Sequence, residues 1–129
     1  ELITRALEAE LGPQRAPMSP EVLDVLVTAF ADLRTGSTAS GVPVKRPDAV
    51  MSTAEAVNVG VAASMSARYL GDGRVRAADI ARQLIGVVLK GEAEDARRMN
   101  FYVDSVVRER ARTSAHWKDF FSAAQGLWE

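Results

Sequence analysis

The sequence contains no cysteine and only one histidine, His116, in 129 residues. Without cysteine the chain forms neither disulfides nor thiolate zinc sites, and it offers no cysteine nucleophile. Such a composition fits the reducing cytoplasm. The longest apolar runs, such as residues 85–89, are far too short to cross a bilayer. We therefore expect a cytoplasmic protein without a membrane span.

Neither sign of charge dominates, because 16 basic residues stand against 17 acidic ones for a net charge of −1. A nucleic-acid interface would need a concentrated basic excess. Arginines do gather in the last third of the chain, at Arg97, Arg98, Arg108, Arg110 and Arg112. Acidic residues lie at helical spacing from them, at Glu94, Asp95, Asp104 and Glu109. This pattern predicts an ion-paired, solvated helix face and no nucleic-acid partner.

The length of the chain fits one domain, and 47% hydrophobic and 26% charged residues are typical of a globular protein. Apolar residues recur at helical spacing, and no strand pattern of any length appears. We expect an all-α fold, a compact bundle of about six helices. They are expected over residues 1–11, 20–34, 52–70, 77–90 and 93–112, with a last one capped by residue 113 or 114. The first residue is Glu1 instead of Met, which suggests an excised fragment, although a processed terminus would look the same.

Two serines mark helix starts. Ser19 precedes Pro20 and Glu21, which suit the first turn of a helix. Ser52 and Glu55 form a capping box, in which the hydroxyl bonds the Glu55 N–H and the carboxylate reaches back to the Ser52 N–H. Along this second helix the predicted core stripe is Ala54, Val57, Val61, Met65 and Tyr69. Its wide apolar face predicts that it is the central helix of the bundle.

Two stretches between the helices are predicted to be irregular. Residues 35–51 combine small polar residues with two glycines and two prolines, as in a surface loop with at most a short edge segment at Val42 and Val44. Residues 71–74, Gly-Asp-Gly-Arg, lack the further oxygen ligands of a calcium loop. We interpret them as a tight turn between helices.

The chain carries no complete catalytic motif. It has no Walker A loop, no dinucleotide-binding glycine pattern and no zinc-protease helix. His116 has no candidate nucleophile placed opposite it. Trp117 and Trp128 are more typical of core packing than of an aromatic ligand-binding site. We therefore assign no catalytic residue and no metal ligand to this chain.

The helix start at Ser52 is the best candidate for a binding site. Free N–H groups and the positive end of the helix dipole form a ready anion site around Ser52 and Thr53. A serine that only caps its helix leaves the same pattern, and the capping box alone favours that interpretation.

Three stretches of the sequence form a series. The first is the helix start at residues 19–23 (SPEVL), with a basic, proline-containing loop after it at 44–47 (VKRP). The second is residues 51–56 (MSTAEA), and the third is residues 71–80 (GDGRVRAADI). Together they cover about residues 19–90 and resemble the small helical lid that follows the nucleotide-binding core of AAA+ ATPases, particularly the MoxR type. In such lids the second stretch begins the sensor-2 helix, and the third looks like the turn into the next helix.

The resemblance implies a lid-like helical domain over residues 1–90, with a leading helix and linker over 1–18, and a C-terminal helical extension over 91–129 packed on it. It further implies that the longer parent protein binds ATP and Mg, assembles with neighbouring ATPase subunits as a homo-oligomer, and remodels a client protein. The lid helps to close over ATP and contributes no Walker A or Walker B motif, so the fragment alone is not an enzyme.

One position departs from the family pattern. Many AAA+ lids place an arginine near the start of the sensor-2 helix, where it reaches the γ-phosphate, and this chain has Ala54 there. Arg46, just before the helix, can approach the same space. The resemblance thus implies Ser52, Thr53 and Arg46 as nucleotide-facing residues, with sensing carried either elsewhere than Ala54 or by backbone and packing alone.

A second hypothesis needs no nucleotide. The chain would then be a free-standing helical protein-interaction module, with aromatic anchors in a groove or dimer seam at Trp117, Phe120, Phe121 and Trp128. The two hypotheses differ in whether these rings are buried and in whether a Walker A and Walker B core precedes the domain.

Overall fold

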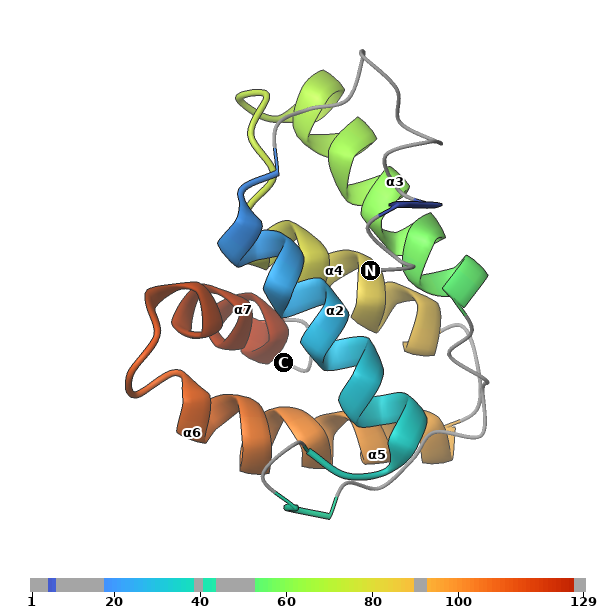
Figure 1. Cartoon of the computed structure of the whole chain (residues 1–129), viewed down its shortest axis with the longest axis vertical. Helices are drawn as coiled ribbons and strands as arrows, with labels where there is room; N and C mark the ends of the chain where they lie inside the picture. Colours follow the sequence, from blue (N-terminus) through green and yellow to red (C-terminus); the bar gives the residue numbers. More distant parts are fainter. Residues whose placement is uncertain (1–4, 7–17, 39–40, 44–52, 90–92, 127–129) are drawn as a thin grey trace.

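The computed structural model describes residues 5–6, 18–38, 41–43, 53–89 and 93–126. Within these residues the fold is all-α, as predicted (Figure 1). Its elements are α2 (Pro20–Thr35), α3 (Thr53–Leu70), α4 (Ala77–Leu89), α5 (Ala93–Tyr102), η2 (Val103–Val107), α6 (Arg108–Arg110) and α7 (Ala115–Gly126). Since α5, η2 and α6 follow one another without a gap, these elements make five helices. Residues 5 and 6 are also helical, and the rest of the helix predicted over 1–11 lies outside the described residues.

Extended pairing is limited, within the described ranges, to two isolated bridges. One joins Met18 to Val75, and the other joins Ser37 to Pro43. The second bridge lies in the predicted surface loop, where the Thr38 N–H donates to the Val42 carbonyl at 2.9 Å. None of the helices in the described part of the chain is long and apolar enough to cross a membrane.

Both ends of α2 form as the sequence predicts. The Ser19 hydroxyl accepts the Val22 N–H at 3.2 Å, and Pro20 takes the first helical position. At the other end Gly36 adopts a φ of 76°, which a residue with a Cβ rarely does, and its N–H donates to the Asp32 carbonyl at 3.0 Å. The buried face of the helix comprises Val22, Val25, Leu26, Ala29, Phe30, Asp32 and Leu33.

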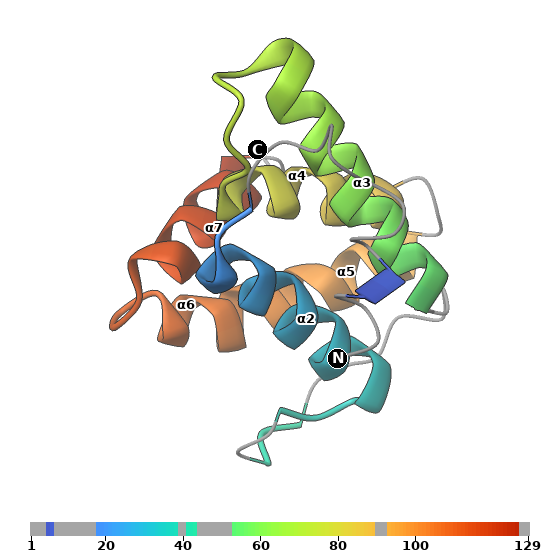
Figure 2. The same ribbon diagram turned by 45° about the horizontal axis from the view of Figure 1, so that its top comes forward.

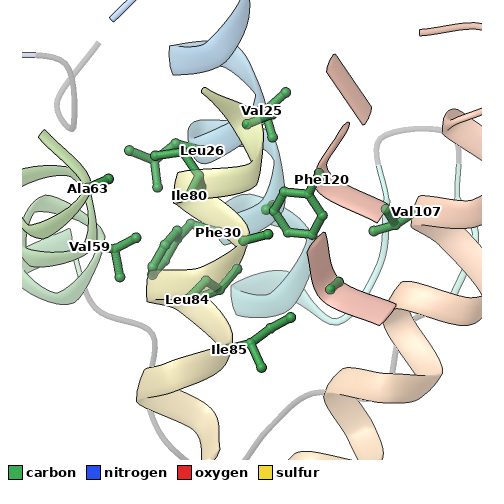
Figure 3. Close-up of a cluster of buried hydrophobic side chains, with 14 of the residues drawn as sticks. Val25, Leu26, Phe30, Val59, Ala63, Ile80, Leu84, Ile85, Val107 and Phe120 are labelled. Atoms are coloured by element: carbon green, nitrogen blue, oxygen red, sulfur yellow. The ribbon is translucent and has the colours of Figure 1, made fainter. Parts of the chain in front are cut away.

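The core is built around α4, and the prediction that α3 is central was wrong. α4 packs against α2, α3, α5 and α7. In Figure 3 its Ile80 and Leu84 lie between α3 on one side and Phe120 of α7 on the other. α2 covers the same core, lying between α3 and α7 in both views of the molecule (Figure 1, Figure 2). α3 is therefore an edge helix that contacts α4 and α2.

The stripe predicted for α3 is corrected in the same way. Val57 is buried, but Ala54 is exposed and the side chains of Met65 and Tyr69 are 46% and 63% exposed. The helix instead buries a face of mostly small residues, namely Ala56, Val57, Val59, Ala63, Ser64 and Ala67. Apolar residues occur on both faces of α3, so spacing alone could not tell which face is buried. Small side chains allow α3 to approach α4 closely, and this packing selects the buried face.

The long helix over residues 93–110 contains a π-helical stretch at Val103–Val107. A π-turn bonds residue i to i+5 and so takes one residue more than an α-turn. Two α-turns span about 7.2 residues, so two turns with one extra residue span about 8.2. Tyr102 and Arg110 are eight residues apart and consequently face the same side of the helix.

That side carries a buried polar network. The Tyr102 hydroxyl donates to Asp32 Oδ2 at 2.7 Å, and Arg110 Nη1 donates to the same oxygen at 2.7 Å and to the Tyr102 oxygen at 3.3 Å. Asp32 is 3% exposed and Tyr102 is fully buried. The Arg110 guanidinium also lies 4.7 Å from the centre of the Trp117 ring. The network therefore joins α2, the long helix and α7.

The expectation of an ion-paired arginine face holds for Arg97, Arg108 and Arg112, whereas Arg98 pairs at 3.4 Å with Asp95, which is buried. Arg97 pairs with Glu94 at 2.7 Å, Arg108 with Asp104 at 2.5 Å and Arg112 with Glu109 at 3.6 Å. These pairs are exposed and contribute little stability. Arg110 differs because its partner, Asp32, comes from another helix and is buried.

The pKa of the Tyr102 phenol is raised well above the ordinary value of 10.0, first because the ring is buried and second because the Asp32 carboxylate lies next to the hydroxyl. The hydroxyl therefore stays protonated and acts as a donor. We expect Tyr102→Phe, which removes this bond to a charged acceptor, to lower the free energy of unfolding by about 1.5–3 kcal/mol. Chemical denaturation measures the loss.

Tyr69→Phe is the matched control, because the same atom is removed from an exposed ring. It should change the unfolding free energy by less than about 0.5 kcal/mol. Equal effects of the two substitutions would contradict a stabilising role for the buried network.

Candidate functional site

The predicted site at the start of α3 is only partly described. Thr53 is the first residue of the helix, Ala54 is exposed and Glu55 is half-buried in the first turn. Ser52 and Arg46 lie outside the described residues, so the capping box and the role of Arg46 stay predictions. The position where the lid pattern expects an arginine thus holds a small, exposed side chain.

A cavity of about 610 Å³ lies elsewhere, where α2, α4 and α7 begin. Its lining includes Met18, Val22, Arg74, Val75, His116 and Asp119. In Figure 1 α3 begins on the side where α4 ends, away from these three helix starts. The helix starts at Ser19 and at residue 113 or 114 follow from local sequence signals, but no local signal indicates that these starts meet.

The turn before α4 forms one wall of this cavity. The prediction of a tight turn is confirmed, since Gly73 has a φ of 86° and its N–H donates to the Ala67 carbonyl at 2.8 Å. Asp72 Oδ1 accepts the Arg74 N–H at 3.1 Å and Arg76 Nη1 at 2.9 Å. These hydrogen bonds lower the pKa of the Asp72 carboxyl to about 2, with the larger effect from the Arg76 side chain and a smaller one from the Arg74 N–H.

Two aspartates accept hydrogen bonds from backbone N–H groups at the start of α4. The residue before the helix is Arg76, which has no side-chain acceptor, and the Arg76 N–H donates to Asp79 Oδ2 at 2.8 Å. The Ala78 N–H donates to Asp119 Oδ2 of α7 at 2.9 Å. Asp119 thus does for α4 what an N-cap side chain does, but from a different helix. No local pattern signals this contact, because 41 residues separate the two partners.

His116 lies at the start of α7, where Ser114 is the cap. The Ser114 hydroxyl accepts the Trp117 N–H at 3.3 Å, as predicted. His116 is half-buried and lines both the cavity at α4 and a second cavity of about 340 Å³ beside Glu21 and Asp24. The hydroxyls of Ser19 and Ser114, which line these cavities, both accept helix-capping bonds. This arrangement favours a structural or binding role for His116 over catalysis.

The aromatic residues of α7 are not exposed anchors. Phe120 is fully buried, Trp117 is buried against it with ring centres 5.5 Å apart, and Phe121 is half-buried 5.0 Å from the Arg108 guanidinium. Trp128 lies outside the described residues. In the part of the chain that the structure describes, no group of histidine, aspartate or glutamate side chains is placed to hold a metal ion.

Comparison with known proteins assigns the family. The model of the YehL-like AAA+ ATPase C-terminal domain matches residues 1–127, so the chain belongs to this family. It is 34% identical over 118 residues to the uncharacterized protein YehL of Escherichia coli (strain K12). That match takes in 89% of the chain but only 30% of the relative's length. No solved structure matches the chain significantly.

These findings favour one of the two sequence-based hypotheses. The chain is the C-terminal domain of a YehL-like AAA+ ATPase, and its relative is much longer. A free-standing module with aromatic anchors is disfavoured, because the described anchors of α7 are used in the fold.

The bond from Asp119 to α4 is testable. We expect Asp119→Ala to lower the free energy of unfolding by about 1 kcal/mol, the usual loss for a helix cap. Asp104→Ala is the control, since Asp104 pairs, among the described residues, only with the exposed Arg108 on its own helix and should contribute less than about 0.5 kcal/mol. If denaturation showed the two aspartates to be equivalent, Asp119 would not act as a cap.

Proposed function

We propose that this domain is the lid of a MoxR-type AAA+ ATPase, which helps to close over ATP and to assemble homo-oligomeric rings that remodel a client protein. Membership of the AAA+ C-terminal domain family over residues 1–127 is the observation that carries this proposal. The three lid-like stretches support it, since they precede or begin α2, α3 and α4, the helices that build the core with α7.

In the proposed arrangement the nucleotide-binding core of the longer protein holds ATP and Mg, and the start of α3 faces the phosphates. The exposed Ala54 fits this role because it leaves the first turn open to a close approach. Backbone N–H groups at a helix start attract anions without any side chain. The lid then responds to nucleotide through its backbone and packing, with Ser52, Thr53 and Arg46 as the nearest side chains.

The division of labour between lid and core gives a direct test. The longer protein that contains this domain is expected to hydrolyse ATP, whereas the 129-residue domain alone is expected to show no turnover. Phosphate release measured on both proteins checks this. Turnover by the purified domain would overturn the proposal, as would an inactive longer protein that binds no ATP.

The orientation of α3 is tested by adding charge at its start. In the longer protein, Ala54→Glu should raise the KM for ATP about fivefold, because a carboxylate opposes the phosphates at an energy of about 1 kcal/mol. The fold should tolerate this change, since an acidic residue suits the first turn of a helix.

Ser122→Glu is the control for this substitution. It places the same charge at an exposed position on α7, away from the start of α3, and should leave the KM unchanged. An unchanged KM in Ala54→Glu, with normal ATPase activity, would show that the start of α3 does not face the nucleotide.

A further inference from the structure

The two cavities at the starts of α2 and α7 share one lining residue, His116. We propose that together they form a groove that binds an extended peptide segment of a partner protein, with an acidic residue at one end, a basic residue at the other and apolar residues between. This proposal goes beyond the lid function and does not rest on it, because the starts of α2, α4 and α7, which line the two cavities, lie away from the start of α3 (Figure 1).

The floor of the groove is apolar. Val22 and Val75 line the larger cavity with Met18, and Val25 and Trp117 line the smaller one. The cavities measure about 610 and 340 Å³, within the range of pockets that hold small-molecule ligands. Each cavity can therefore accept an apolar side chain of a bound segment.

The larger cavity carries one charge that the fold does not use. Arg76 is paired with Asp72, and the Asp119 carboxylate accepts the Ala78 N–H. The Arg74 guanidinium, in contrast, has no side-chain partner among the residues that the structure describes. It remains available for a carboxylate of a ligand.

The smaller cavity has the opposite charge. Glu21 and Asp24 line it, and neither carboxylate has an ion-pair partner within the described ranges. The groove is thus basic at Arg74 and acidic at Glu21 and Asp24. A nucleic acid or a polyphosphate would be repelled at the acidic end, whereas a peptide with a charge of each sign matches both ends.

Backbone NMR spectra of the 129-residue chain provide the test. The probe is acetyl-Asp-Leu-Gly-Leu-Lys-amide, and its uncharged mate is acetyl-Asn-Leu-Gly-Leu-Gln-amide. The charged probe should shift amide signals of residues 18–25, 74–77 and 114–119 and bind about fivefold more tightly than the mate, the gain of about 1 kcal/mol expected from exposed ion pairs.

Arg74→Glu should weaken the charged probe about tenfold. The same variant should prefer a probe with lysine in place of aspartate. A variant that had only lost its structure would show no such preference. Arg97→Glu is the matched control, since Arg97 is exposed on α5 and paired with Glu94, and it should bind like the unchanged chain. Equal affinity for the charged and uncharged probes, or equal losses in the two variants, would overturn the proposal.

Discussion

A single carboxylate, Asp32, is the point on which the packing of this domain depends. It lies in the last turn of α2, where the helix dipole disfavours an anion, and it is buried. Tyr102 and Arg110 satisfy it from the long helix, and Arg110 in turn covers Trp117 of α7. A buried charge is tolerated only when it is paired and hydrogen-bonded. The network therefore specifies how three helices meet, in a core that is otherwise mostly aliphatic and aromatic.

Local signals in the sequence predicted most of the helices correctly. Ser19, Gly36 and Ser114 act at the helix ends as their types suggest, and the turn around Gly73 forms as expected. The errors concern contacts between helices. The buried face of α3 was misassigned because Met65 and Tyr69 have larger apolar side chains than the residues that pack, at a helical spacing that also fits a core face. The pairing of Asp119 with α4 links distant parts of the chain, so no spacing rule could reveal it.

The functional predictions likewise succeeded where they depended on local motifs and failed where they depended on contacts between helices. A series of motifs along the chain was enough to indicate an AAA+ ATPase, and the family match over residues 1–127 bears this out. The binding surface could not be predicted, because it arises where the starts of α2, α4 and α7 converge. The buried network, in contrast, left one signal in the sequence, because Asp32 is an acidic residue in an apolar helical stripe, seven residues after Val25. Such a residue on a buried face indicates a partner elsewhere in the chain.

The π-turn has a consequence for charge. In an uninterrupted α-helix the residue two turns beyond Tyr102 would be the seventh along, which is Glu109. Its carboxylate would then point toward the carboxylate of Asp32, and like charges would meet in the interior. The additional residue of the turn replaces that acid by Arg110, so one residue of helical register decides between repulsion and attraction. A relative of the same length whose helix lacks the π-turn would place the acid of position 109 against Asp32, whereas a relative one residue shorter in this turn would keep the arginine there.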